Sequence, residues 1–319
     1  YYTHLKLVKH FATLIEAFRK EGAEFAHIIK MGRTQLEDAV PMTLGQTFNG
    51  FASILEHELK NLDFAAQDFL TVNMGATAIG TGITAEPGYA EKCIAALGKI
   101  TGLDIKLADD LIGATSDTSC MVGYSSAMKR VAVKMNKICN DLRLLASGPR
   151  CGLGEINLPA MQPGSSIMPG KVNPVIPEVV NQVAFNVIGN DVTITMAAEA
   201  GQLELNAFEP IIFYCLFQSI DTLGYAVQTF VDNCVTGITA NETRCRYFVE
   251  NSVGIITAIC PYVGYQKAAE IAKEAIKTGE SVKKLIIEQG ILTEEQMDEI
   301  LDPVQMTEPG ISGKEHLTD

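Results

Sequence analysis

The chain has no apolar stretch of the length found in membrane proteins. None of its uninterrupted apolar runs approaches the roughly 18 residues that cross a bilayer, and the longest, Pro210 to Phe217, has the length of a core helix segment. Residue 1 does not open a secretory signal. With 47% hydrophobic residues among 319, the composition predicts a soluble globular protein with a substantial core, as one large or two unequal domains.

Cysteine pairs are also missing. The eight cysteines form no CxxC motif, and none has a neighbouring histidine at metal-ligand spacing. Buried thiols of a reducing cytosol therefore explain them better than a structural zinc site, and we expect a cytoplasmic protein with no metal ligands. The five histidines follow no pattern that indicates a site, and we expect them on the surface or in packing contacts. They are His4, His10, His27, His57 and His316.

Positive charge is scarce, since 25 Lys and Arg stand against 38 Asp and Glu, a formal net charge of −13. Such a surface repels the phosphates of nucleic acid, which argues against nucleic-acid binding. It also repels a dianionic metabolite. A site for a carboxylate substrate must therefore supply its own local positive charge and N–H donors.

Alternation typical of β-strands is nearly absent, whereas helical periodicity is widespread. Over 115–145 the apolar residues recur at spacings of 3 and 4, the seam of a long bundle helix. Comparable patterns cover 43–72, 176–200 and 205–235. The sequence therefore predicts an all-α bundle of long helices that forms an oligomer. The seam residues are Met128, Val131, Met135, Ile138, Leu142 and Leu145.

The ends of the chain differ from its middle. Residues 1–30 already have a helical pattern at Tyr1, so we expect further sequence upstream. Gly237 to Asn241 interrupts the pattern, and shorter helices follow, one of them opened by a capping box at Thr293 to Gln296. We expect a central helical-bundle domain over 1–240 and a small helical C-terminal domain over 241–319.

A long polar loop is the most informative segment. Gly148 to Pro177 holds six of the twelve prolines and no periodicity, and loops of that length in compact domains are usually functional. Its central string, 164–174, is not a phosphate-binding P-loop, because five residues separate its glycines and Val172 follows Lys171. Gly80 to Ala85 matches a dinucleotide fingerprint by letters only, since no β-rich run precedes it.

The string GSSIMPGKVNP at 164–174 resembles the signature loop of the fumarase/aspartase superfamily. A second block, Gly32 to Gln46, is similar to another active-site segment of that superfamily. There Gln35 follows Thr34, as in some aspartate ammonia-lyases, whereas class II fumarases have His. The stretch Met196 to Asn206 is also aspartase-like. The resemblance covers the chain from about residue 1 to its end and favours an ammonia-lyase that converts L-aspartate to fumarate and ammonia.

Such chemistry abstracts a proton beside a carboxylate, so the charge must spread into an ene-diolate held by preorganised donors. The resemblance implies Ser165 as the base, with Lys171 and Asn173 binding the substrate carboxylate. It implies further hydrogen bonds from three side chains, which are Ser166, Thr34 and Gln35. The other signature-loop residues would form a lid, and they are Gly164, Ile167, Met168, Pro169 and Gly170.

The resemblance also implies a homotetramer whose sites each combine segments of three subunits. No cofactor is required, and activation by a divalent cation stays open. A third active-site block would precede Tyr1, so we expect these 319 residues alone to be inactive. Two alternatives stay open: a class II fumarase-type hydratase and a catalytically silent structural homologue.

Some residues of these blocks have a structural interpretation as well. Read alone, Thr34 and Gln35 would be helix-boundary residues. Arg33, Asp38 and Glu178 could support a site, but we expect them in structural ion pairs or caps.

Overall fold

The computed structural model describes residues 1–165, 167–302 and 305–316. The chain divides into two compact units, each assembled from three segments. The first unit comprises Tyr1–Ala17, Phe51–Arg143 and Ala160–Thr236. The second comprises Phe18–Gly50, Leu144–Pro159 and Gly237–Asp319. The contacts thus group Gly237–Asp319 with two earlier segments, and a domain boundary at residue 240 stays a prediction.

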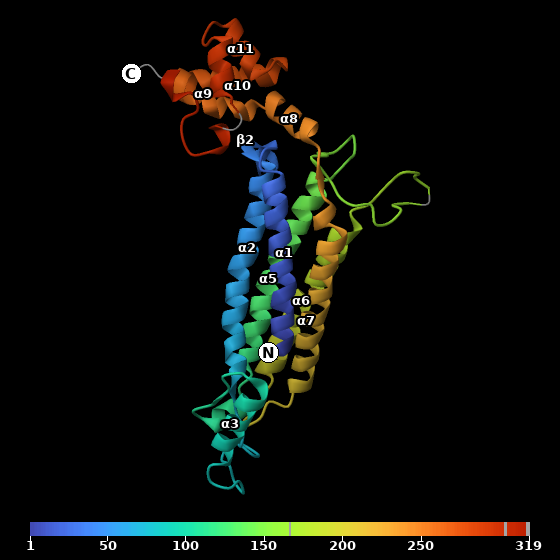
Figure 1. Ribbon diagram of the computed structural model, residues 1–319, viewed down its shortest axis with the longest axis vertical. Coiled ribbons are helices and arrows are strands. Elements are labelled where there is room, and N and C mark those ends of the chain that lie inside the picture. The colour runs from blue at the N-terminus through green and yellow to red at the C-terminus, as the bar shows by residue number, and fades with distance from the viewer. Residues whose placement is uncertain (166, 303–304, 317–319) are drawn as a thin grey trace. The chain divides into compact units, whose positions relative to one another are not determined.

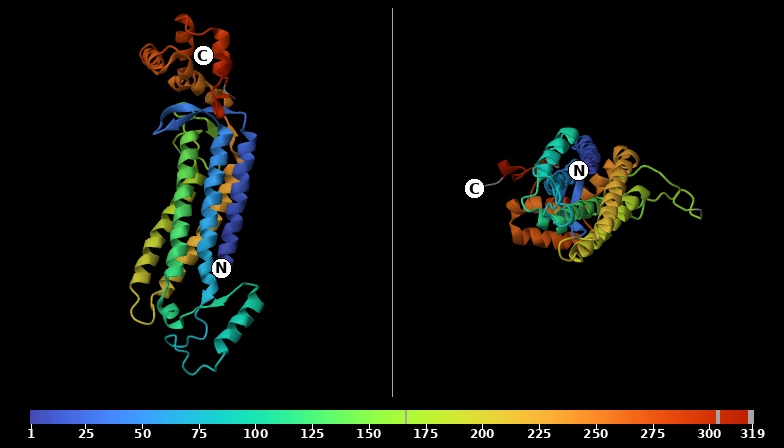
Figure 2. Two further views of the ribbon diagram at one scale, coloured as in Figure 1. Left: turned by 90° about the vertical axis from the view of Figure 1, so that its left-hand side faces the viewer. Right: turned by 90° about the horizontal axis from the view of Figure 1, so that it is seen from below.

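The first unit is a bundle of long helices that run side by side (Figures 1 and 2). All six predicted seam residues of α5 are buried, and α6 packs along α7. The prediction of an all-α bundle of long helices is therefore confirmed. The helices that contribute to it are α1 (Tyr2–Glu24), α2 (Leu44–Ala66), α5 (Ser119–Leu145), α6 (Val175–Glu199) and α7 (Glu209–Asn233).

The helix α7 is long and apolar enough, with its following turn to Gly237, to cross a membrane by length and composition. Its residues Ile212, Leu223 and Phe230 are buried in the protein, and the helix packs against α6. These contacts are those of a core helix.

Short elements connect α2 to α5 in the first unit, with α3 at one end of the bundle (Figure 1). Gly80 lies within this connection. A Cβ added at Gly80 would come within 2.4 Å of the Ile112 backbone, so a glycine is needed for the two segments to pack closely. The elements are η1 (Gln67–Leu70), β3 (Thr71–Val72), α3 (Tyr89–Thr101), β4 (Lys106–Leu107) and α4 (Leu111–Ser116), with β3 parallel to β4.

The second unit packs short helices around an apolar core that includes Ile259, Ile271, Ile286 and Met297. The predicted capping box at Thr293 is present at the start of α12. The helices are α8 (Glu242–Asn251), η3 (Val253–Ile255), α9 (Ile256–Val263), α10 (Tyr265–Thr278), α11 (Val282–Glu288), α12 (Glu294–Ile300), η4 (Gln305–Thr307) and η5 (Lys314–His316). The turn η2 (Val235–Gly237) precedes them, and β5 (Ile156–Asn157) pairs antiparallel with β6 (Thr239–Ala240).

A β-hairpin in the second unit was not predicted. Strand β1 (Ile29–Thr34) pairs antiparallel with β2 (Glu37–Thr43). Met31 of β1 is fully buried in the core of this unit, so tertiary burial stabilises a strand where local alternation is weak. Thr34 and Gln35 consequently lie at a hairpin tip, and their interpretation as helix-boundary residues is wrong.

Candidate functional site

The signature loop of the first unit closes on itself through its backbone. The Gly164 N–H donates to the Lys171 carbonyl at 2.7 Å, and Pro163 pairs with Val172 in an antiparallel bridge. The Asn173 Nδ2 adds a bond to the Gly164 carbonyl at 3.2 Å. A Cβ on Gly164 would lie 2.5 Å from the Lys171 carbonyl oxygen, so only glycine permits this closure. The structure thereby brings Ser165, Lys171 and Asn173 into one loop.

Ser165 follows the closing glycine directly. Its Oγ accepts a hydrogen bond from the Ile167 backbone N–H at 3.2 Å. An N–H donor at this oxygen favours the ionised hydroxyl, the form that a proton-abstracting serine needs. The neighbouring Ser166, predicted to bind substrate, lies outside the described residues.

Lys171 supplies the positive charge of the loop. Its backbone N–H donates to the Met168 carbonyl at 3.2 Å across a turn in which Gly170 has a φ of +79°. The side chain is exposed, and within the described parts of the chain no carboxylate forms an ion pair with it. Its ammonium group is therefore free to meet an anionic ligand.

The loop leads directly into the N-terminus of α6 (Figure 1). The Val175 N–H donates to the Asn173 carbonyl at 2.9 Å, and Pro174 is the N-cap residue. Unpaired N–H groups and the helix dipole place partial positive charge at this end of a helix. Lys171 and the N-terminus of α6 are thus two sources of positive charge at the loop, and their binding of a carboxylate stays a prediction.

A polar network joins the first turns of α6 to α5. Glu178 pairs with Arg143 at 3.5 Å, as expected for a structural ion pair. Arg143 also donates to the Asn181 Oδ1 at 3.4 Å, and the Asn181 Nδ2 donates to the Asn136 Oδ1 at 2.7 Å. This network was not predicted from the sequence. Its only local signal is the recurrence of Asn136, Asn140 and Arg143 at spacings of 4 and 3 on one helix face.

Thr34 and Gln35 belong to the second unit, whereas the signature loop belongs to the first. Thr34 pairs with Glu37 across the hairpin, which leaves Gln35 and Leu36 as the two central residues of the turn. The φ angles of Gln35 and Leu36 are +54° and +68°, and the side chains of Thr34, Gln35 and Leu36 are exposed. Left-handed non-glycine residues each cost on the order of 1–3 kcal/mol and cluster at functional sites.

Buried charges anchor the hairpin strand that precedes this tip. Glu155 is fully buried and pairs with Arg33 at 2.7 Å and with Lys30 at 3.6 Å. Burial lowers the pKa of Lys30, and the neighbouring Glu155 charge opposes that shift. On the other strand Asp38 accepts a hydrogen bond from the Ser252 hydroxyl at 2.6 Å. Arg33 thus forms a structural ion pair as expected, whereas Asp38 forms a hydrogen bond with a hydroxyl in place of the expected ion pair or cap.

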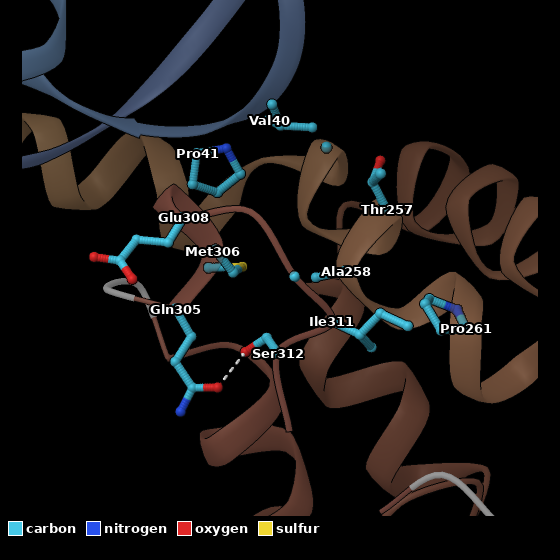
Figure 3. A pocket seen from close by; sticks show the side chains of 12 residues that line it. Val40, Pro41, Thr257, Ala258, Pro261, Gln305, Met306, Glu308, Ile311 and Ser312 are labelled. Atoms are coloured by element: carbon cyan, nitrogen blue, oxygen red, sulfur yellow. Dashed lines mark hydrogen bonds between the residues drawn. The ribbon is translucent and has the colours of Figure 1, made fainter. Parts of the chain in front are cut away.

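A hollow of about 220 Å³ in the second unit has a different character (Figure 3). Val40 and Pro41 of β2 form one side, and Met306 and Ile311 contribute further apolar surface. Its described lining residues include one carboxylate, Glu308, and no cation. Such a surface lacks the positive charge that a dicarboxylate ligand needs.

Two histidines take part in local contacts. His4 is buried, with one ring nitrogen 3.0 Å from Asp63 and the other 3.1 Å from the Tyr124 hydroxyl, which makes it a packing residue. His316 pairs with Glu299, and Glu315 completes a group whose ligand atoms lie within 4.8 Å of one another. Both carboxylates are exposed, and exposed acidic groups are common without a metal ion, so this group does not by itself indicate a metal site.

Two family models match two separate stretches of the chain. Residues 2–189 match the family described as lyase, and residues 255–308 match the family described as fumarase C C-terminus. The first match includes the hairpin tip and the signature loop.

Curated relatives are similar over nearly the whole chain. It is 55% identical over 307 residues to the aspartate ammonia-lyase of Pseudomonas fluorescens, which covers 96% of this chain and 64% of that protein. It is 51% identical over 312 residues to the aspartate ammonia-lyase of Bacillus subtilis (strain 168), covering 98% of this chain and 66% of that protein. The chain therefore spans slightly less than two thirds of the length of these relatives.

Solved structures share the fold. A fumarate lyase:delta crystallin from Brucella melitensis bound to cobalt is 52% identical, with a TM-score of 0.93 over 96% of this chain and 66% of that one. A class II fumarase from Schistosoma mansoni is 32% identical, with a TM-score of 0.92 over 96% of this chain and 68% of that one.

Proposed function

The chain belongs to the fumarase/aspartase superfamily of lyases, and from this premise we propose that the protein is an aspartate ammonia-lyase that interconverts L-aspartate with fumarate and ammonia. The observation that carries the proposal is the closed signature loop, which holds Ser165 beside an amide N–H and includes the exposed Lys171. Gln35 after Thr34 and the identity of 51–55% to proteins named aspartate ammonia-lyase favour this member of the superfamily.

In the proposed reaction the ionised Ser165 removes a proton from C3 of aspartate. The electron pair of that C–H bond passes into the adjacent carboxylate and forms an ene-diolate. Lys171, Asn173 and the N-terminus of α6 stabilise the added negative charge, because they are donors already oriented before the reaction. The pair then returns to form the C2–C3 double bond as the C–N bond breaks and nitrogen leaves with its electrons. Protonated nitrogen departs as ammonia, and Ser165 is left neutral.

Thr34, Gln35 and Ser166 supply further hydrogen bonds to the substrate in this proposal. The exposed tip of the hairpin supports such a role for Thr34 and Gln35, since their strained turn presents them to the outside of the unit. The remaining residues of 164–173 act as a lid that excludes water once substrate is bound.

We propose a homotetramer with sites shared between subunits, in the cytoplasm. Large apolar side chains left exposed on α6 and α7 support the assembly, because monomers rarely leave so many uncovered on one pair of helices. Examples are Phe185, Met196, Tyr214, Phe217 and Tyr225. No cofactor takes part in the proposed chemistry, and activation by a divalent cation is tested by adding Mg²⁺ to the assay.

A fumarase-type hydratase is the second candidate, favoured by the similarity to the class II fumarase of Schistosoma mansoni. Incubating the full-length protein with fumarate and ammonium separates the two. Consumption of ammonia with formation of aspartate supports the proposal, whereas malate supports the hydratase. If neither product forms, the result supports a catalytically silent homologue and overturns both enzymatic proposals.

A further inference from the structure

The tip that carries Thr34 and Gln35 holds a backbone conformation that its own residues disfavour. Gln35 and Leu36 have φ angles of +54° and +68°, as a two-residue hairpin turn of this kind requires, although asparagine and glycine usually fill these positions. Such strain persists only where surrounding contacts hold it in place. The source of those contacts lies immediately outside the turn.

The first contact is made by Arg33, one residue before Thr34. Its Nη1 donates to the Glu155 carboxylate at 2.7 Å and to the Met31 carbonyl at 3.3 Å. The guanidinium group also lies 5.1 Å from the centre of the Phe248 ring. A charge-assisted bond to a fully buried carboxylate restricts the strand more than a surface pair would.

The second contact is made by Asp38, the cross-strand partner of Arg33. Its carboxylate accepts from the Ser252 hydroxyl at 2.6 Å, and the Ser252 Oγ in turn accepts from the Gly254 N–H at 2.9 Å. A Cβ on Gly254 would lie only 2.3 Å from the Ala39 carbonyl oxygen. Strand β2 therefore packs directly against η3.

We infer that Arg33 and Asp38 are positioning residues for the proposed lyase reaction, because they hold the two strands so that the strained tip presents Thr34 and Gln35 to the substrate. The inference rests on the proposed function and assigns these two residues no contact with substrate. Removing either anchor lets the tip relax toward turns without left-handed residues. The side chains of Thr34 and Gln35 then lose their orientation.

The test uses the full-length protein with Asp38→Ala, Ser252→Ala and the double variant. Hydrogen–deuterium exchange of the segment 33–39 reports the tip directly, and steady-state kinetics with fumarate and ammonium give kcat and KM. We expect faster exchange in all three variants and a fall in kcat/KM of about tenfold or more. The double variant should be no worse than Ser252→Ala, because that change alone already removes the hydroxyl that bonds to Asp38. Asp38→Asn keeps an acceptor oxygen for Ser252 and should resemble the wild type.

Tyr262→Phe is the matched control, since it removes one hydroxyl bond, to the Ser312 carbonyl, elsewhere in the same unit. It should leave exchange of 33–39 and the kinetics unchanged. Unchanged exchange in Asp38→Ala and Ser252→Ala would overturn the inference whether or not the wild type is a lyase. Kinetic losses of equal size in the control would overturn it too, since they would indicate general destabilisation. A wild type without lyase activity defeats the proposed function, while the exchange data still decide whether the anchors hold the tip.

Discussion

Gly164 and Lys171 meet across the neck of the signature loop, where the N–H of the first donates to the carbonyl of the second at 2.7 Å. The contact leaves no room for a side chain, because a Cβ on Gly164 would lie 2.5 Å from that carbonyl oxygen. Glycine at position 164 therefore allows the neck of the loop to close beside Ser165 and Lys171.

Replacing this glycine should open the loop. We expect Gly164→Ala to lower kcat/KM of the full-length enzyme at least about a hundredfold, since small displacements of catalytic groups have effects of that size. The melting temperature should change little because the loop is exposed. Gly50→Ala is the control, as an added Cβ there meets no atom within 4 Å. Equal activity of the two variants would contradict the role of the closure.

Ser165 is expected to act as the base. Ser165→Ala should leave the circular dichroism spectrum and the oligomeric state unchanged while lowering kcat by roughly 10²–10⁴-fold, the usual contribution of general base catalysis. Single-turnover and steady-state assays of the full-length protein measure this. More than about a tenth of the wild-type rate in the variant is incompatible with the assignment.

Lys171 should act more on the transition state than on the bound substrate, because charge on the carboxylate grows as the proton leaves. Lys171→Met is therefore expected to depress kcat and to raise KM. Lys106→Met removes an exposed lysine that pairs with Asp104 and controls for the loss of one positive charge. An effect of Lys171→Met on KM alone would indicate simple attraction of the anion.

Glu21 should make stability depend on pH. It is buried, and within the described residues its Oε2 has no hydrogen-bond partner. Burial, assisted by the charge of Glu24, raises its pKa from 4.5 to about 7. Between pH 4.5 and about pH 7 the folded state therefore binds more protons than the unfolded state, so the free energy of unfolding falls as pH rises through this window. The loss of stability is complete above about pH 7.

Glu21→Gln should remove that loss of stability. Its melting temperature should exceed that of the wild type at pH 8, with a difference that shrinks toward pH 4.5. Thermal unfolding followed by circular dichroism across this range measures it. Glu16→Gln alters an exposed carboxylate of the same helix and should leave the profile as it is. A constant difference between Glu21→Gln and wild type at all pH values would refute the prediction.

Periodicity located the long helices well. The pattern over 115–145 predicted one helix, and α5 begins at Ser119 because Asp117 ends the short helix α4 before it. The capping box at Thr293 was equally visible, since both of its partners lie within four residues. Roles for Ser165, Lys171 and Asn173 could be proposed from the string that contains them, and they stay predictions until the variants are measured.

The sequence by itself determined the helical bundle and the position of the signature loop, because helix spacing and an eleven-residue string are local properties. Only the tertiary structure decided that 29–43 forms a hairpin and that its tip is left-handed at Gln35 and Leu36. It also paired Arg33 with Glu155, 122 residues away, and Arg143 with Glu178. Local patterns cannot predict these contacts, because their stability comes from buried charges and apolar side chains that meet only when distant segments pack together.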